Sequence, residues 1–202
     1  MNEKFTGKGR YTFPNHAEYS GDFKEDLPEG IGQLELPNGD SYEGQWEAGE
    51  MSGFGIYRFY NEKLDRFKGQ YEGQFSHSKF NGFGKMVYPN SSVFCGNWRD
   101  GLKEGLGEFA CVNGETIMGR WENDGLVEGI YTFNDGSKYV GHFKNFKFNG
   151  FGSLIHPDGS TQQGYWEDNI LVDGFSFELD EKVNNILNNQ ILVIENENRE
   201  SN

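Results

Sequence analysis

The stretch Tyr139–Thr161, which reads YVGHFKNFKFNGFGSLIHPDGST, contains the pattern that the rest of the chain repeats. An aromatic residue opens it, a glycine stands two places later, a second aromatic follows at four places, and GFG begins at eleven. A Pro-Asp-Gly turn sequence precedes the next copy. Self-similarity at a period of about 20–50 residues indicates an array of small structural units that pack on their neighbours. The fold of this stretch therefore decides the fold of the chain.

Copies of this pattern account for most of the 202 residues. A half copy occupies residues 5–18, and the starts of the later copies are separated by 23, 29, 23, 23, 22 and 23 residues. The third place of every full copy is glycine and the fifth is aromatic. The full copies start at Tyr19, Tyr42, Tyr71, Phe94, Ile117, Tyr139 and Gln162. We therefore predict one repeat array over residues 1–178.

The alternation of residues within a copy predicts a β-hairpin. In Tyr42–Glu47, YEGQWE, the two rings and the glycine alternate with polar residues, and a period of two places them on one face of a strand. The glycine between the rings is expected to leave room for a ring from the neighbouring strand. Turn sequences such as Asn38-Gly39-Asp40 fit, because glycine and asparagine adopt positive φ readily. The repeats have no apolar residues at helical spacing, so the array is predicted to be all-β.

Several copies depart from the regular pattern. The copy that starts at Tyr42 has six additional residues, most simply placed within Tyr60–Gln70, where we predict a longer charged loop. A partner contact is the less favoured alternative for this segment. The copies that start at Ile117 and Gln162 are each one residue short between their tryptophan and the next glycine. In the last copy Phe175 and Phe177 change the phase of the alternation, which we interpret as the end of the regular sheet.

The sequence after the repeats has a different period. Over residues 179–194 the apolar side chains are spaced as on one side of a helix, and Asp180 is suited to cap its start. These apolar residues are Leu179, Val183, Ile186, Leu187, Ile191 and Ile194. We predict a helix that either covers the exposed last edge of the sheet or binds a partner, which includes a second copy of the chain. Residues 195–202 are predicted to be a disordered tail.

Units such as Tyr42-Glu-Gly-Gln-Trp-Glu-Ala-Gly, followed by Gly53-Phe-Gly55, resemble the MORN repeat and its Tyr-x-Gly-x-Trp…Gly-x-Gly motif. The resemblance covers the chain from Phe5 to Phe177 in about seven units. It departs from the motif where Ile117 and Gln162 replace the leading aromatic residue. The resemblance implies an elongated, twisted, single-layer antiparallel sheet with one hairpin per repeat.

MORN arrays occur in radial-spoke and other axonemal proteins, in protist cytoskeletal scaffolds, in membrane-junction proteins and beside catalytic domains. Only residues 179–202 follow the repeats in this sequence. The resemblance therefore implies a non-enzymatic protein–protein interaction scaffold, a structural component of a ciliary or flagellar axoneme or another cytoskeletal assembly. The alternative is a membrane-surface module that recognises anionic phospholipids.

The formal charge of −14 limits the partners. Nucleic acids and anionic membranes both require clustered Lys and Arg, so we expect no nucleic acid partner and disfavour a lipid one. Two cysteines, Cys95 and Cys111, suit a reducing compartment. The first ten residues lack the apolar core of a signal peptide, and no apolar run approaches the ~20 residues of a membrane helix. We expect a soluble cytoplasmic protein of the cytoskeleton.

No residue pattern predicts catalysis, a metal or a cofactor. Gly82-Phe-Gly84-Lys85 lacks the spacing of a phosphate-binding loop, and the same Gly-x-Gly recurs in other units. The histidines at 16, 77, 142 and 156 lie far apart and share no metal-ligand spacing with the cysteines. The glycines are therefore interpreted as structural.

The aromatic face is the candidate binding surface. A single-layer sheet has no second layer to cover its rings, and a large exposed apolar surface marks an interaction site. We predict that some rings pack internally and that others receive an apolar helix or peptide, while the acidic rim selects a partner with basic flanks. The candidate residues are Tyr42, Trp46, Tyr71, Phe75, Trp98, Trp121, Tyr139, Phe143 and Trp166. Edge strands or C-terminal helices could also join two arrays.

Overall fold

The computed structural model describes residues 4–61 and 66–174 of the chain. These belong to two compact units, Met1–Gly101 and Leu102–Asn202, and each unit is described by itself. The predicted helix over residues 179–194 and the predicted tail over 195–202 lie outside the described residues, as does the change of phase at Phe175 and Phe177.

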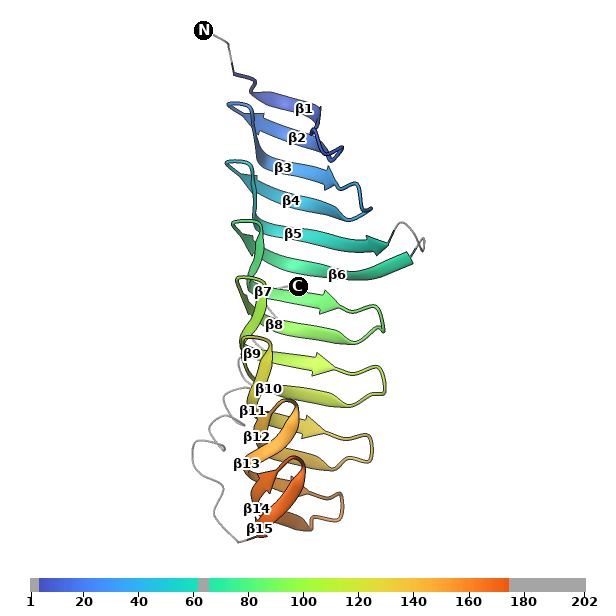
Figure 1. Ribbon diagram of the computed structural model, residues 1–202, viewed down its shortest axis with the longest axis vertical. Helices are drawn as coiled ribbons and strands as arrows, with labels where there is room; N and C mark the ends of the chain where they lie inside the picture. The colour runs from blue at the N-terminus through green and yellow to red at the C-terminus, as the bar shows by residue number, and fades with distance from the viewer. Residues whose placement is uncertain (1–3, 62–65, 175–202) are drawn as a thin grey trace. The chain divides into compact units, whose positions relative to one another are not determined.

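The first unit is an open antiparallel sheet that has eight strands within the described residues. Each strand lies beside its neighbours in the sequence, so the strand order follows the chain (Figure 1). The strands are β1 (Gly7–Thr12), β2 (Glu18–Lys24), β3 (Leu27–Glu35), β4 (Ser41–Glu47), β5 (Glu50–Asn61), β6 (Arg66–Ser76), β7 (Lys79–Val87) and β8 (Val93–Arg99).

The second unit repeats this arrangement with seven strands in the part of the chain that the structure describes. They are β9 (Leu102–Ala110), β10 (Thr116–Glu122), β11 (Gly125–Thr132), β12 (Lys138–Lys144), β13 (Lys147–Ile155), β14 (Thr161–Glu167) and β15 (Ile170–Gly174). Both units are single-layer, antiparallel and built from successive hairpins. The predicted all-β fold of repeated hairpins is confirmed.

Two kinds of turn alternate along each sheet. At one edge the strands are joined by two residues that both have positive φ, as at Asn123 (48°) and Asp124 (67°). This geometry matches the right-handed twist of paired strands. At the other edge the turns are longer: the Leu36 amide donates to the Asp40 carbonyl, and the Gly39 amide donates to the Leu36 carbonyl, both at 2.9 Å. Gly39 has a φ of 85° there, as its turn sequence predicts.

The two-residue turn of each of these hairpins is hydrogen-bonded to the second strand of the preceding hairpin. The Gly49 amide donates to the Pro28 carbonyl at 2.9 Å, a link between residues 21 positions apart. The corresponding link from Ser78 to Met51 spans 27 positions, so the six additional residues do not disturb this edge. We call this series of bonds the turn ladder.

The additional residues mainly lengthen a hairpin. Strands β5 and β6 continue to pair as far as Asn61 and Arg66. The prediction of a charged loop over Tyr60–Gln70 is therefore wrong, except for residues 62–65, which lie outside the described part. A bulge between Phe59 and Tyr60 shifts the register within the extension.

Candidate functional site

The tyrosine at the first place of a repeat copy lies over two glycines that are paired across neighbouring strands. A Cβ atom at Gly55 would lie 2.4 Å from the ring of Tyr42, and one at Gly44 would lie 2.5 Å from its hydroxyl oxygen. Gly44 and Gly55 are partners across β4 and β5. The glycines therefore make room for one ring, which belongs to the neighbouring strand for Gly55 but to the same strand for Gly44. The same arrangement occurs at Tyr19, Tyr71 and Tyr139.

The hydroxyl of this tyrosine binds the backbone at a bulge. Tyr42 Oη donates to the Gln45 carbonyl at 2.8 Å, and Gln45 has no partner residue on β5 because the register shifts between Gly44 and Trp46. Equivalent bonds run from Tyr19 to Asp22, from Tyr71 to Gln74 and from Tyr139 to His142, at 2.9, 2.9 and 3.1 Å. Burial raises the pKa of Tyr42 above its ordinary value, because the phenolate would lose its hydration.

The tryptophan at the fifth place of a copy connects that copy of the repeat to the preceding copy. The indole N–H of Trp46 donates to the Gly32 carbonyl at 3.2 Å. Aromatic rings of successive copies are also in contact: Tyr42 contacts Phe75 edge-on, with ring centres 4.9 Å apart. The same indole bond is formed by Trp98 to Gly84, Trp121 to Gly107 and Trp166 to Gly152. These contacts hold the rings in fixed positions.

All nine predicted binding residues lie in this ring layer and are buried, with none more than 8% exposed. They form the hydrophobic core of the sheets, which we call the ring face. The internal packing that the sequence predicted for some rings extends to all nine. Contact between any of them and a partner stays a prediction.

In the two short copies, which start at Ile117 and Gln162, a leucine side chain takes the place of the tyrosine ring. Leu126 Cδ1 would lie 2.8 Å from a Cβ at Gly119, and Leu171 Cδ1 would lie 2.8 Å from one at Gly164. Their first places are Ile117 and Gln162, which have no phenol to reach a bulge carbonyl. The missing residue therefore accompanies the replacement of the first-place ring by a leucine, whereas Phe94, which also lacks a phenol, opens a copy of full length.

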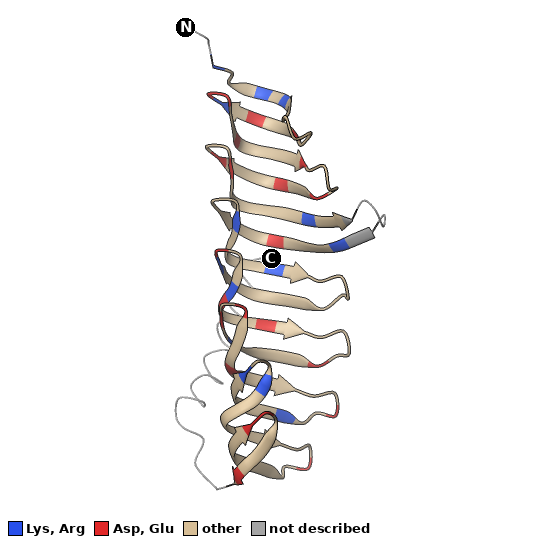
Figure 2. Ribbon diagram, viewed as in Figure 1, with Lys and Arg blue, Asp and Glu red and all other residues tan. Residues whose placement is uncertain are grey.

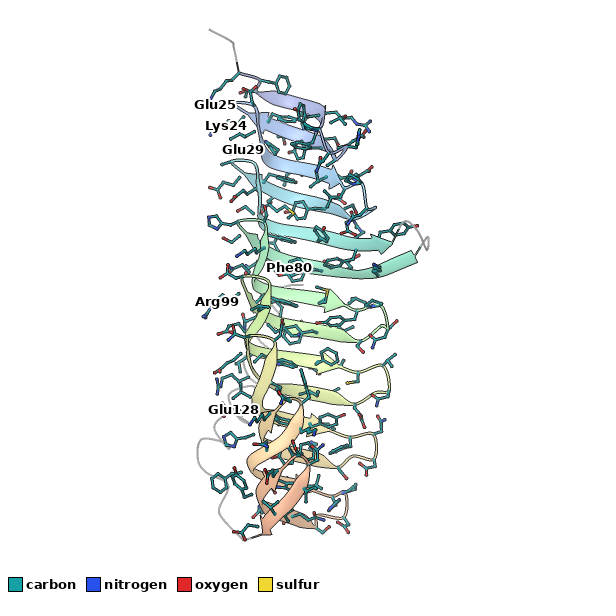
Figure 3. All side chains as sticks on the ribbon, viewed as in Figure 1. Lys24, Glu25, Glu29, Phe80, Arg99 and Glu128 are labelled. Atoms are coloured by element: carbon teal, nitrogen blue, oxygen red, sulfur yellow. The ribbon has the colours of Figure 1, made fainter. Side chains whose placement is uncertain are left out.

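The register partner of the fifth-place aromatic residue differs between copies of the repeat. In two copies this difference leaves a groove on the ring face. Phe80 stacks on Tyr71 with ring centres 3.9 Å apart and lies over the sheet (Figure 3), and Phe148 stacks on Tyr139 at 3.7 Å. Phe80 is the register partner of the fifth-place Phe75. At the corresponding places Pro28 pairs with Phe23 and Met51 pairs with Trp46. These two side chains cannot stack as phenylalanine does.

The space beside Pro28 and Met51 is an open apolar groove of about 1080 Å³ in the first unit. Its lining includes Phe5, Tyr11, Phe13, Leu27, Pro28, Leu34, Leu36, Trp46 and Met51. Phe5, Tyr11 and Leu27 are 49%, 50% and 47% exposed. Of the nine predicted residues only Trp46 lines the groove. The other residues of the groove were missed in the sequence analysis. The sequence feature that could have indicated it is the presence of Pro28 and Met51 at the positions that Phe80 and Phe148 occupy in other copies of the repeat.

Acidic residues lie at the turns between β2 and β3 and between β4 and β5 (Figure 2), and the charged residues that line the groove are Asp26 and Arg10. Glu25 and Glu29 lie at this edge beside Lys24 (Figure 3). The charged residues at the two turns are Lys24, Glu25, Asp26, Glu29, Glu47 and Glu50. Lys4 forms an ion pair with Glu25 at 3.1 Å, and Asp26 accepts a hydrogen bond from the Phe5 amide at 2.8 Å. The local excess of negative charge remains.

Within the described residues, no three His, Cys, Asp or Glu side chains gather as a metal site requires. Cys95 and Cys111 are half-buried and are not joined in a disulfide, and burial together with Glu115 raises the pKa of Cys111. That part of the chain contains no helix with the length and apolar character needed to cross a membrane.

Comparison with known proteins identifies the class. The MORN repeat pattern matches residues 3–18, 19–41, 42–62, 71–93, 94–116, 118–138 and 139–161. These segments make up more than half of the sequence, and the chain belongs to the MORN-repeat family.

Two relatives show this similarity. The chain is 32% identical to human (Homo sapiens) alsin over 127 residues, which is 58% of this chain and 7% of alsin. It is 33% identical over 75 residues to MORN repeat-containing protein 3 of Xenopus laevis, which is 37% of this chain and 32% of that protein. The chain thus spans less than a tenth of alsin and about a third of the Xenopus protein.

Two solved structures are also similar to the chain. One is the SAS-4 (dCPAP) TCP domain of Drosophila melanogaster in complex with a proline-rich motif of Ana2 (dSTIL), with a TM-score of 0.42 and 14% identity. The alignment covers 79% of this chain and 90% of that domain. The other is the G-box domain of the microcephaly protein CPAP, with a TM-score of 0.33, 16% identity, and coverage of 79% and 93%.

Proposed function

We propose that this protein is a non-enzymatic protein–protein interaction scaffold whose groove in the first unit binds an apolar peptide segment with basic flanks. The observation that carries the proposal is the groove itself. Phe80 and Phe148 close the ring face over their own tyrosines, whereas Pro28 and Met51 leave an apolar space with half-exposed walls. An exposed apolar concavity of this kind suits an apolar side chain of a partner.

The walls of the groove are held in place before a partner arrives. Trp46 is fixed by its bond to Gly32, and Phe5 contacts Phe23 edge-on at 5.4 Å while its amide donates to Asp26. Because the rings are already ordered, binding loses less conformational entropy than it would on a mobile surface. A short apolar segment is therefore a suitable ligand.

The charge at the rim selects the flanks of that segment. The two neighbouring turns carry five acidic residues and one lysine, and Lys4 offsets one of the acids. Lys or Arg on either side of the apolar segment would complement this charge and speed association. Such attraction is screened within about 10 Å at 0.1 M salt, so affinity should fall as salt is added.

The family resemblance supports a structural role in a cytoskeletal assembly. We place the protein in the cytoplasm, with the axoneme of a cilium or flagellum as the proposed location. The ring face and the turn ladder suit this role, because they leave a rigid sheet on which partners can be held at fixed spacing.

A peptide-library selection against the full chain tests the proposal. We expect enriched peptides with an apolar centre flanked by Lys or Arg. Their affinity should fall at least tenfold for the variant Met51→Phe, which replaces a flexible wall residue of the groove by a ring and leaves all nine predicted ring residues intact. The matched control is Phe54→Ser, which removes an exposed ring on the opposite face of the same strand. Equal binding by Met51→Phe and the native chain would contradict the groove.

A further inference from the structure

The face opposite the ring face differs in character between the two units. In the first unit the second-place residues are Ser20, Glu43, Glu72 and Cys95, none of which is a large apolar side chain. In the second unit, Met118 pairs with Ile130, Ile130 with Val140, and Val140 with Ser153. We call these four neighbouring residues of β10–β13 the outer patch.

The centre of the outer patch is buried. Val140 is 4% exposed and Ser153 is 0% exposed, although the sheet has a single layer. Phe151 and Tyr165, in the next row of the same face, are 51% and 42% exposed. The Ser153 hydroxyl is also buried and has no hydrogen-bond partner. Side chains on the open face of a single layer are exposed unless a further segment lies over them, so the burial of Val140 and Ser153 is the observation that points to such a segment.

We propose that residues 179–194 of the same chain dock on the outer patch. Their apolar residues are spaced as on one side of a helix and need an apolar surface, while the asparagines between them suit solvent. The proposal places this segment on the face of the second unit, and not on the last strand edge.

The length of the chain allows this docking. The last described strand, β15, ends at Gly174 and is separated from β13 by β14 alone, which is about 10 Å at ordinary strand spacing. The four residues 175–178 can span about 13 Å when extended. The connection therefore reaches the row that contains Ser153.

The length of the segment also matches the patch. Sixteen residues of helix extend about 24 Å. The five strands β10–β14 cover about 19 Å between the first and the last. A helix laid across them would therefore cover every residue of the outer patch.

Site-specific photo-cross-linking of the full chain tests the docking. p-Benzoylphenylalanine is placed at Gln163, which pairs with Ser153 on this face, and as a control at Glu43, the same place in the unit that starts at Tyr42. Isotopically heavy and light chains are mixed before irradiation, so links within one chain are distinguished from links between two. We expect position 163, but not position 43, to link to residues 179–194 of its own chain.

Two further variants make the result specific. Leu187→Asp places a charge on the apolar side of the segment and should reduce the yield of the link at least tenfold. Asn185→Asp places the same charge on the polar side and should leave the yield unchanged. Links only between heavy and light chains, no link to residues 179–194, or a yield that Leu187→Asp does not change would each overturn the proposal.

Discussion

The phenol oxygen of Tyr42 donates a hydrogen bond to the carbonyl of Gln45, three residues later on the same strand, at 2.8 Å. The ring can reach this carbonyl because Gly44 and Gly55 offer no side chains beneath it. The bulge at Gln45 then leads to Trp46, whose indole binds the preceding unit at Gly32. The spacing Tyr-x-Gly-x-Trp is therefore one connected set of contacts.

Removing that hydroxyl should destabilise the first unit. We expect Tyr42→Phe to lower the free energy of unfolding by about 1 kcal/mol, because the Gln45 carbonyl loses its donor while the ring stays in place. Urea unfolding followed by tryptophan fluorescence measures the change. Tyr165→Phe, which alters an exposed ring, should have no effect. Equal midpoints for the two variants would show that the bond contributes nothing.

The glycine under the ring should be intolerant of any side chain. In Gly55→Ala the new Cβ would lie 2.4 Å from the Tyr42 ring, so either the ring or the strand must move. Overpacking of this kind costs roughly 1–3 kcal/mol. Gly174→Ala is the control, because the nearest atom there would be 3.5 Å away. Thermal unfolding of both variants checks the difference, and a stable Gly55→Ala protein would contradict it.

A ring at position 51 should stabilise the fold while it narrows the groove and weakens binding. Met51→Phe would place a ring over Tyr42 as Phe80 lies over Tyr71, at a stacking distance of 3.9 Å in the natural case. Aromatic pairs contribute about 0.5–1.5 kcal/mol beyond the area that they bury. We expect a higher unfolding temperature together with weaker peptide binding. A lower unfolding temperature would show that the two positions are not equivalent.

Alkaline pH should unfold the protein through its tyrosines. Burial raises the pKa of Tyr19 to about 12, and burial with the nearby Asp40 carboxylate raises the pKa of Tyr57 to about 12. The unfolded chain ionises near pH 10, so it loses protons first and is favoured as the pH rises. The stabilisation is present below pH ~10 and is lost as the pH approaches about 12. Phenolate absorbance and unfolding midpoints between these values measure the effect, which should be weaker in Tyr57→Phe.

Acid should loosen the turns of the second unit. The hydroxyl and amide of Ser160 lower the pKa of the Asp158 carboxyl by hydrogen bonding to it. The folded carboxylate therefore stabilises the turn above the ordinary carboxyl pKa, and this contribution is lost as the pH falls through the lowered value. Asp158→Asn should be less stable at neutral pH and should show a smaller further loss on acidification. Denaturant midpoints at neutral and acid pH compare it with the native chain.

The sequence alone predicted the hairpins and the ring face, because a period of two and the turn residues are local features. It did not predict the bulge at Gln45, which depends on where a tyrosine hydroxyl ends in three dimensions. The extension of β5 and β6 was also missed, since charged residues in an insertion resemble a loop.

The groove could have been predicted only by comparing equivalent positions in different copies of the repeat. Pro28 and Met51 are unremarkable in their own sequence context, and their meaning appears only beside Phe80. The nine candidate rings were correctly assigned to one face, but their burial depends on contacts between successive units that a single repeat does not contain.

The turn ladder has a consequence for how such chains can change in length. Its bonds keep one edge of each sheet in strict step, and the insertion in the hairpin of β5 and β6 is accommodated entirely away from that edge. The edge with the longer turns can therefore accept foreign loops, for example at Gly136 or Gly159, without moving the next unit. The two-residue turns keep a constant spacing, so new recognition loops could be grafted into the longer turns at intervals set by the strands.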